Sequence, residues 1–236
     1  MNIHGYSGLT LLDYPQKTAA MVYTGGCNMR CLYCHNAVLV EDPASQPLIS
    51  EEEVLEKLAK RKGILDGLVI TGGEPTLNRD LPDFCRKVKA LGFLVKLDTN
   101  GTNPEMVSKL IAEGLIDYVA MDIKSAPSIH RYSMVTPIGG VQFSNIEMTK
   151  NLLMKQDRID YEFRTTVVSG IHNDDDFKDI ADWCSDAKAY FLQAYRECPG
   201  INPEGFHLST PSSEDLGRYL EILRIRIPGA EIRGQS

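Results

Sequence analysis

The sequence predicts an α/β fold, a partial (β/α)6 barrel of parallel strands that is open on one side. Three observations predict it: short apolar runs alternate with amphipathic segments, six such pairs follow in order, and polar residues come after the runs. This alternation is typical of a parallel sheet covered by helices. Six units are two short of a closed eightfold barrel, and 236 residues lie at the low end of its size range. A doubly wound sheet is the alternative.

Each element has its own signal in the sequence. The strands are apolar runs, expected at residues 18–24, 68–71, 94–98, 118–122, 161–168 and 190–195. The helices have apolar residues at helical spacing and are expected at residues 50–61, 81–91, 104–113, 145–155, 175–185 and 213–226. Ser50 and Glu53 form a capping box for the first helix, and Gly92 follows the second. Pro104 opens the third, and we expect Ser213 to cap the last.

The chain shows no sign of division into parts. No linker rich in proline, glycine or serine interrupts it, so we expect one domain over residues 1–236. Residues 1–14 are expected to form a hairpin-like N-terminal extension. Residues 230–233 are expected to form a short last strand.

Composition and charge exclude several classes of protein. The formal net charge of −7 argues against nucleic-acid binding, which usually needs a basic surface. No apolar run approaches the roughly 18–20 residues of a membrane helix, so we expect no membrane partner. The N-terminus has no basic stretch followed by an apolar one, so no signal peptide is expected. With six scattered or clustered cysteines, we expect reduced thiols and a cytoplasmic location.

Three cysteines are clustered within eight residues, with the spacing C-x3-C-x2-C: Cys27, Cys31 and Cys34. Three thiolates on one short loop can bind three irons of a four-iron cluster and leave the fourth iron with an open position. A zinc site with His35 as the fourth ligand is the alternative. The other three cysteines lie far from this loop in the sequence: Cys85 and Cys184 are expected to be buried thiols, and we expect no catalytic role for Cys198.

Polar residues follow each predicted strand after the first. The carboxyl ends of parallel strands are where barrels and open α/β folds bind their ligands, so we expect these residues to meet in one site. They are Gly72, Gly73 and Glu74; Asp98, Thr99 and Asn100; Asp122 and Lys124; and Gln193 to Arg196, with Arg164 inside the fifth strand.

These residue types suggest specific chemistry. The glycine pair permits close approach of the backbone to a ligand, and Glu74 offers an acceptor for an ammonium group. Asp98 and Asp122 would repel each other unless a cation or basic group lies between them, and Lys124 is a candidate. Arg164 lies in an apolar strand and needs a partner; facing inward, it could bind a carboxylate or a ribose. A plain turn, a solvated acid and an outward arginine are the alternative interpretations.

The cysteine spacing, with an aromatic residue before the last cysteine, resembles the radical S-adenosylmethionine superfamily. The segment Gly72-Gly73-Glu74-Pro75 resembles the motif of that family that binds the methionyl amino group. The resemblance implies that the open iron binds the cofactor's amine and carboxylate. An electron from the reduced cluster then produces a 5′-deoxyadenosyl radical, which takes a hydrogen atom from the substrate. A [4Fe-4S] cluster and S-adenosylmethionine are the implied cofactors.

Two further segments resemble glycyl-radical activating enzymes: Asp98-Thr99-Asn100-Gly101 and Asp122-Ile123-Lys124. This comparison also implies a monovalent cation held by Asp98, Thr99 and Asp122. The implied catalytic residues are Cys27, Cys31, Cys34 and Arg164. The implied cofactor-binding residues are Tyr33, against the adenine, and Gly72, Gly73, Glu74, Asp98, Thr99, Asn100, Asp122, Lys124, Arg164 and Arg196. Arg196 departs from the pyruvate formate-lyase activating enzymes, which carry a histidine there.

The segment GLTLLDYP at residues 8–15 and the ending EIRG at residues 231–234 resemble activating proteins of anaerobic ribonucleoside-triphosphate reductase. The resemblance implies that the substrate is a glycine of a glycyl-radical protein, most simply that reductase, and that a flavodoxin or ferredoxin supplies electrons. The alternatives are an activase of another glycyl-radical enzyme such as pyruvate formate-lyase, a small-molecule radical enzyme of the queuosine-precursor synthase type, and a zinc-binding interaction module.

Overall fold

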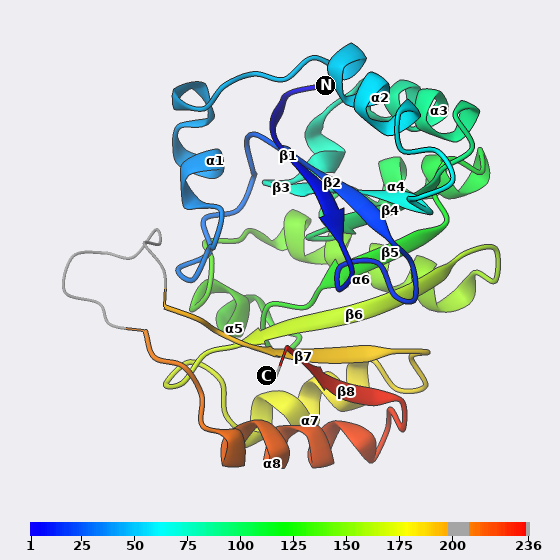
Figure 1. Cartoon of the computed structure of the whole chain (residues 1–236). Helices are drawn as coiled ribbons and strands as arrows, with labels where there is room; N and C mark the ends of the chain where they lie inside the picture. The colour runs from blue at the N-terminus through cyan, green and yellow to red at the C-terminus, as the bar shows by residue number, and fades with distance from the viewer. Residues whose placement is uncertain (198–207, 235–236) are drawn as a thin grey trace.

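The computed structural model describes residues 1–197 and 208–234. Within them, one sheet holds eight strands that lie side by side in chain order (Figure 1). The strands β2 to β8 run parallel, and β1 pairs antiparallel with β2 at one edge. The strands are β1 (Ile3–Thr10), β2 (Ala19–Thr24), β3 (Gly67–Gly72), β4 (Leu94–Thr99), β5 (Tyr118–Asp122), β6 (Asp160–Val167), β7 (Tyr190–Ala194) and β8 (Ala230–Arg233).

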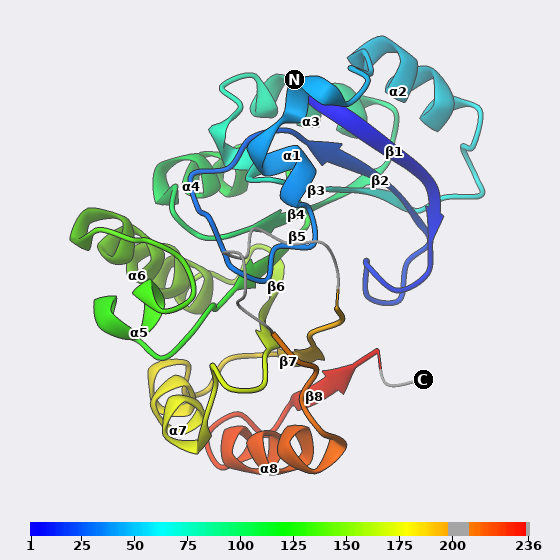
Figure 2. The same ribbon diagram turned by 90° about the vertical axis from the view of Figure 1, so that its left-hand side faces the viewer.

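The sheet curves into a barrel that does not close. Among the described residues, β8 pairs only with β7, and no ladder joins β8 to β1. Helices cover the outer side of the curved sheet, as Figure 2 shows. The prediction of a partial barrel that is open on one side is confirmed. The six predicted strands correspond to β2–β7, and β8 is the short last strand expected at residues 230–233.

Residues 1–14 differ from the prediction, because they do not fold back on themselves. They contribute the single strand β1, which forms its hairpin with β2, so that Tyr6 pairs with Val22 and Ser7 with Met21. The N-terminal segment is therefore an edge strand of the main sheet. The apolar side chains of β1, Ile3, Tyr6 and Leu9, lie three residues apart and do not alternate, so no strand pattern identified this segment.

The helices lie close to their predicted positions. Ser50 caps α2, accepting a hydrogen bond from the Glu53 amide at 3.1 Å as the capping box requires. Ser212, and not Ser213, caps α8. The helices are α1 (Ala37–Glu41), α2 (Glu51–Ala59), α3 (Leu81–Ala90), α4 (Pro104–Ala112), α5 (Ile129–Ser133), α6 (Gly140–Lys155), α7 (Asp174–Trp183) and α8 (Ser213–Arg224). None of them is long and apolar enough to cross a membrane.

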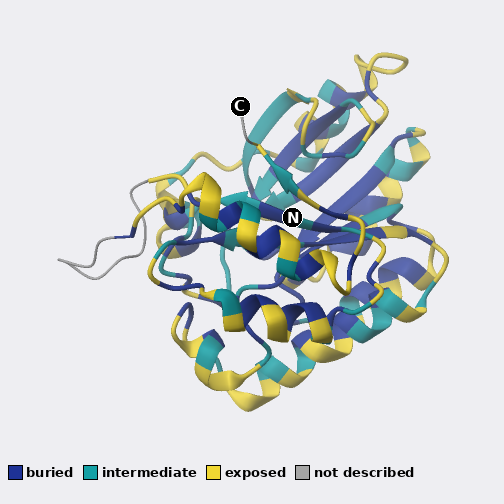
Figure 3. Ribbon diagram, turned by 90° about the horizontal axis from the view of Figure 1, so that it is seen from below, coloured by how far each residue is buried: buried dark blue, intermediate teal, exposed yellow. Residues whose placement is uncertain are grey.

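The main core lies between the outer face of the sheet and the helices. Its members are fully buried aliphatic and aromatic side chains such as Leu68, Val95 and Phe84. Figure 3 shows the buried strands surrounded by helices that expose their outer faces. Cys85 and Cys184 have no exposed surface and belong to this core, which confirms their prediction as buried thiols. Cys198 lies outside the described residues.

The inner face of the sheet has a different character. Side chains alternate along a strand, so the residues at every second position point away from the helices and into the barrel. Met21 and Val69 pack with Tyr14 in a small apolar cluster inside the barrel. The strand positions further round the barrel carry charges, including Lys96 on β4 and Glu162 on β6, both with no exposed surface. A charged barrel interior is the setting of the site.

Candidate functional site

A cavity of about 340 Å³ opens where the carboxyl ends of the parallel strands meet the loop that carries the three clustered cysteines. Twelve of the predicted site residues line it, as expected for ligand sites in barrels of this kind. They are Cys27, Cys31, Tyr33, Cys34, Gly72, Gly73, Asp98, Thr99, Asn100, Asp122, Lys124 and Arg164. Gln193 lines it as well, so the predicted meeting of strand ends in one place is confirmed.

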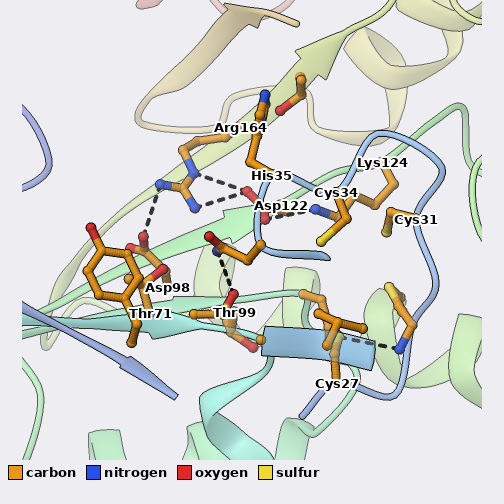
Figure 4. Close-up of a pocket in the computed structure, with 18 of the residues that line it drawn as sticks. Cys27, Cys31, Cys34, His35, Thr71, Asp98, Thr99, Asp122, Lys124 and Arg164 are labelled. Carbon is orange, nitrogen blue, oxygen red and sulfur yellow. Dashed lines mark hydrogen bonds and ion pairs between the residues drawn. The ribbon is translucent and has the colours of Figure 1, made fainter. Parts of the chain in front are cut away.

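The cysteine loop connects β2 to α1 and is anchored to its surroundings by backbone hydrogen bonds. The Gly26 amide donates to the Leu39 carbonyl at 2.8 Å, and the Leu32 amide donates to the Val135 carbonyl at 3.0 Å. Figure 4 shows the sulfur-bearing side chains of Cys27, Cys31 and Cys34 on one side of the pocket. Within residues 1–197 and 208–234, no three histidine, cysteine or acidic side chains form a ready-made metal site. The three thiols are therefore not arranged around a single metal ion.

The donor set of this loop fits an iron–sulfur cluster better than a zinc ion. The ring of His35, the proposed fourth zinc ligand, stacks on Tyr195 with ring centres 5.7 Å apart. Its Nε2 atom lies 3.2 Å from the Arg196 carbonyl oxygen. These contacts orient His35 as a support for the loop. Three thiols without a fourth protein ligand are the set that leaves one iron of a four-iron cluster open.

The glycine pair at the end of β3 lies against the cysteine loop. A Cβ atom on Gly73 would fall 1.9 Å from the Gly26 carbonyl oxygen, and one on Gly72 would fall 2.3 Å from the Thr24 amide nitrogen. Gly72 also has a φ of +118°, a conformation that L side chains rarely adopt. The close backbone approach predicted from the sequence is present. Its partner is the chain's own backbone, so the pair fixes the start of the cysteine loop.

Glu74 does not line the cavity, although the sequence predicted a ligand-binding role. Only 1% of its surface is exposed. One carboxylate oxygen accepts hydrogen bonds from the Thr76 amide at 3.1 Å, the Thr76 hydroxyl at 2.6 Å and the Thr99 hydroxyl at 2.8 Å. The other oxygen accepts from the Asn100 amide at 2.7 Å. Burial raises the pKa of Glu74, and these donors oppose the rise. In this structure Glu74 connects the ends of β3 and β4.

Asn100 extends this connection to the cysteine loop. Its side-chain amide donates to the Asn28 side-chain oxygen at 2.9 Å and lies 3.8 Å from the Cys27 sulfur. Its side-chain oxygen accepts from the Thr102 hydroxyl at 2.7 Å. Asn28 in turn donates to the same hydroxyl at 2.8 Å. The end of β4 and the first cysteine are therefore held in one hydrogen-bonded unit.

Two carboxylates and three cations form the electrostatic centre of the site. Arg164 lies between Asp98 and Asp122, at 3.2 Å and 3.0 Å, as Figure 4 shows. Lys124 contacts the second oxygen of Asp122 at 2.9 Å, and Lys96 contacts the second oxygen of Asp98 at 2.6 Å. Lys124, the predicted neutralising residue, contacts Asp122, and Arg164 points inward to both carboxylates. Lys96 was not predicted.

The cations set the ionisation of both carboxyl groups. Burial alone would raise their pKa values, because it disfavours the charged form. Arg164 and Lys96 outweigh burial and lower the pKa of Asp98. Arg164 and Lys124 likewise lower the pKa of Asp122 to about 2. Both groups are therefore carboxylates at neutral pH, and the five charges sum to +1.

Two other predicted cofactor residues have structural contacts that the sequence did not suggest. Arg196 is exposed and does not line the cavity, and its guanidinium donates to the Gly234 carbonyl at 3.1 Å. Tyr33 borders the cavity, but only 3% of the residue is exposed, and its ring packs against His172 and Tyr195. Its hydroxyl donates to the Lys124 carbonyl at 3.3 Å. In this structure the contacts of Arg196 and Tyr33 stabilise the edge of the site.

Several cavity residues were not predicted. Asp13, Met21 and Tyr23, from β2 and the loop before it, extend the cavity down the barrel. Lys96 contacts Asp98 from the barrel interior, outside the cavity wall. A usable signal existed for Lys96: it precedes Asp98 by two residues in an otherwise apolar strand, so both side chains must share one face.

Solved structures share this architecture. The peptide-bound structure of Streptococcus suis SuiB, titled "bound to precursor peptide SuiA", superposes with a TM-score of 0.68 at 14% identity, over 91% of this chain and 48% of that one. A domain of a pyruvate-formate lyase-activating enzyme from Bacteroides vulgatus superposes with a TM-score of 0.52 at 20% identity, over 71% of this chain and 99% of that one. At these identities the likeness supports the fold.

Sequence comparison is more specific. A protein of Methanocaldococcus jannaschii named "Putative glycyl-radical enzyme activating enzyme" is 32% identical over 98% of this chain and 95% of its own length. The family model described as "Radical SAM superfamily" matches residues 21–184, which include the cysteine loop, the glycine pair and the charged centre. The chain therefore belongs to the radical S-adenosylmethionine superfamily.

Proposed function

We propose that this enzyme activates a glycyl-radical enzyme by removing a hydrogen atom from a glycine of that partner protein. The observation that carries the proposal is the 32% identity, over nearly the full length of both chains, to a relative named as such an activating enzyme. The pocket supports it independently, because a polypeptide loop is too wide for the interior of a closed barrel. Within the part of the chain that the structure describes, no strand pairing joins β8 to β1.

Membership of the superfamily implies a [4Fe-4S] cluster and S-adenosylmethionine as cofactors. When bound and reduced by an external electron donor, the cluster would supply the one electron that breaks a carbon–sulfur bond of S-adenosylmethionine; methionine would be released, and the adenosyl carbon would take one hydrogen atom from the substrate. We assign the cluster to Cys27, Cys31 and Cys34. Lys124 and Arg164, in a site with surplus positive charge, are assigned to the cofactor's carboxylate.

The remaining residues have supporting roles in this proposal. Gly72 and Gly73 keep the cysteine loop close to the end of β3, and Asn100 holds that loop against β4. Gly72, Gly73 and Asn100 line the cavity, and we assign the cofactor's amino group to this edge of it. Glu74 holds the end of β4 in place through its hydrogen bonds with Thr99 and Asn100. Site geometry in enzymes is sensitive to such support, because small displacements of reacting groups reduce the rate strongly.

The finer parts of the proposal concern the partners. We propose anaerobic ribonucleoside-triphosphate reductase as the glycyl-radical protein, on the resemblance of residues 8–15 and 231–234 to its activating proteins. A flavodoxin or ferredoxin would deliver the electron. The contacts of Asp98 favour a source of positive charge other than the monovalent cation that the resemblance implied.

The test is anaerobic. The protein is loaded with iron and sulfide and mixed with S-adenosylmethionine, a reductant and the reductase of the same organism. We expect 5′-deoxyadenosine together with a glycyl radical signal in the electron paramagnetic resonance spectrum. A reductase variant whose target glycine is replaced by alanine is the control and should give no such signal. The Cys31→Ala variant of the activase should give neither product.

Each alternative gives a different result. A radical on pyruvate formate-lyase but not on the reductase would keep the activase proposal and change the partner. Deoxyadenosine without a radical on either protein would overturn it in favour of a small-molecule radical enzyme. Uptake of one zinc ion per chain, without cluster formation, would favour the interaction module.

A further inference from the structure

Lys96 is a buried cation to which the reaction assigns no role. It has no exposed surface, and it lies in the middle of β4 between the apolar residues Val95 and Leu97. Its ammonium nitrogen lies 2.6 Å from Asp98 Oδ1 and 5.9 Å from the centre of the Tyr118 ring. An isolated ammonium group is strongly disfavoured in such surroundings, so its pairing with Asp98 is what makes its burial tolerable.

With Lys96, every carboxylate oxygen of Asp98 and Asp122 has a cationic partner. Asp98 contacts Lys96 through one oxygen and Arg164 through the other. Asp122 contacts Arg164 and Lys124 in the same way. All four carboxylate oxygens therefore have a cationic nitrogen within 3.2 Å. Arg164 and Lys124 balance the charges of Asp98 and Asp122. Lys96 therefore gives these five side chains a net charge of +1.

The arrangement does not fit the monovalent cation that the sequence resemblance implied for Asp98, Thr99 and Asp122. Such a cation needs oxygen ligands. The carboxylate oxygens are occupied by the chain's own cations, and the Thr99 hydroxyl donates to Glu74 at 2.8 Å while accepting from the Gly101 amide at 3.1 Å. A further positive ion would also enter a centre that is already positive, which is unfavourable at short range.

We propose that Lys96 takes the place of a bound alkali cation in this enzyme. Its ammonium holds one oxygen of Asp98, and the other oxygen of Asp98 directs Arg164 toward Asp122 and the cavity. The surplus charge is then available for the carboxylate of S-adenosylmethionine. Lys96 is a positioning residue, because it acts through Asp98 and lies outside the cavity wall. This inference rests on the superfamily's cofactor and is independent of which protein is activated.

The first test needs no variant. The affinity of the cluster-loaded enzyme for S-adenosylmethionine is measured by calorimetry in buffers of equal ionic strength that contain either potassium or choline as the only added cation. Choline is too large to enter an alkali cation site. We expect the two dissociation constants to agree within about twofold, a difference of about 0.4 kcal/mol. A loss of affinity of about tenfold or more in choline would show that an alkali cation is required and would overturn the proposal.

The second test uses Lys96→Met, which keeps the length of the side chain and removes its charge. In choline we expect its affinity for S-adenosylmethionine to fall about tenfold or more, since a charged hydrogen-bonding partner of the site is lost. Potassium or sodium should restore part of that loss, because the vacated oxygen of Asp98 can then bind an alkali ion. Restoration by a cation is a readout that a purely structural defect would not give.

Lys150→Met is the matched control. Lys150 is also a buried lysine, 6% exposed, but its ammonium donates to the Trp183 carbonyl at 2.8 Å, away from the site. We expect this variant to bind S-adenosylmethionine like the wild type in both buffers. Unchanged affinity of Lys96→Met in choline would overturn the proposal, as would a loss that neither potassium nor sodium restores while the variant unfolds at the wild-type temperature. Since only cofactor binding is measured, these results are separate from any failure to activate a partner.

Discussion

Glu74→Ala separates two roles for a residue that the sequence assigned to ligand binding. In the structure the carboxylate accepts four hydrogen bonds from the ends of β3 and β4 and does not line the cavity. If it supports the rim, its removal should destabilise the protein before any cofactor is added. If it binds the cofactor directly, the apoprotein should tolerate the change.

The magnitude follows from those contacts. Hydrogen bonds to a charged group contribute about 1.5–3 kcal/mol each, and a buried donor left without a partner costs about 1–3 kcal/mol. The full sum is not lost, because the variant also avoids the cost of burying a carboxylate and water can reach some donors. We expect the free energy of unfolding to fall by about 3–5 kcal/mol. Glu74→Gln should lose about 1–3 kcal/mol, because its amide can satisfy the Thr99 side but presents a donor to the Asn100 amide.

The assay is urea unfolding of the apoprotein, with the slope m compared between variants to confirm that the same surface is exposed. Glu56→Ala, an exposed position on α2, is the control and should stay within about 0.5 kcal/mol of the wild type. The reasoning is refuted if Glu74→Ala unfolds like the wild type and yet loses its affinity for S-adenosylmethionine. That result would restore the direct contact that the sequence motif implied.

Three further predictions test the cluster loop, the charged centre and the glycine pair. Cys31→Ser should lose most of the iron bound after reconstitution, measured by iron analysis, whereas the core variant Cys85→Ser should retain it; equal retention would contradict the ligand assignment. Asp122 has a pKa lowered to about 2, so it contributes stability above the unfolded-state value of about 3.9 that is lost as the pH falls toward 2. Urea unfolding between these pH values should therefore show a smaller decline for Asp122→Asn than for the wild type, and parallel declines would refute the depressed pKa. Gly73→Ala should lose more than about 3 kcal/mol of unfolding free energy, since its Cβ would overlap a backbone oxygen. The control Gly217→Ala, in open space on α8, should gain about 0.5–1 kcal/mol. Similar effects at the two positions would contradict the clash at Gly73.

The regular elements were predictable because they follow simple periodicities. Strands β2–β7 are apolar runs, and their flanking helices carry apolar residues at helical spacing. α6 was predicted five residues too short, since Gly139 and Gly140 suggest a break. In the structure the side-chain oxygen of Gln142 accepts from the Gly139 amide at 3.0 Å and supports an earlier start. The five-residue helices α1 and α5 are too short for any periodicity to identify.

The sequence predicted which residues belong to the site better than it predicted the directions and partners of their side chains. The rule that ligands bind at strand carboxyl ends identified Asp98 and Asp122, and the charge inside an apolar strand identified Arg164; the structure brings the three together. The direction of a side chain beyond a strand end depends on the loop conformation, which is why Glu74 turned inward and Arg196 outward. No local pattern encodes these directions, because they arise from contacts between residues far apart in the sequence.

Across residues 1–197 and 208–234, β1 and β8 do not pair with each other, and this open seam has a mechanical consequence. In a closed barrel, any change of curvature must stretch or break hydrogen bonds between strands, at about 1 kcal/mol for each one lost. Here the sheet can widen or narrow by small changes of twist spread over the pairs from β1·β2 to β7·β8, with every ladder intact. The strand that carries the cysteine loop, β2, and the strand that carries Gln193, β7, lie near opposite ends of that arc. Bending of the sheet thus changes the width of the pocket mouth without local unfolding.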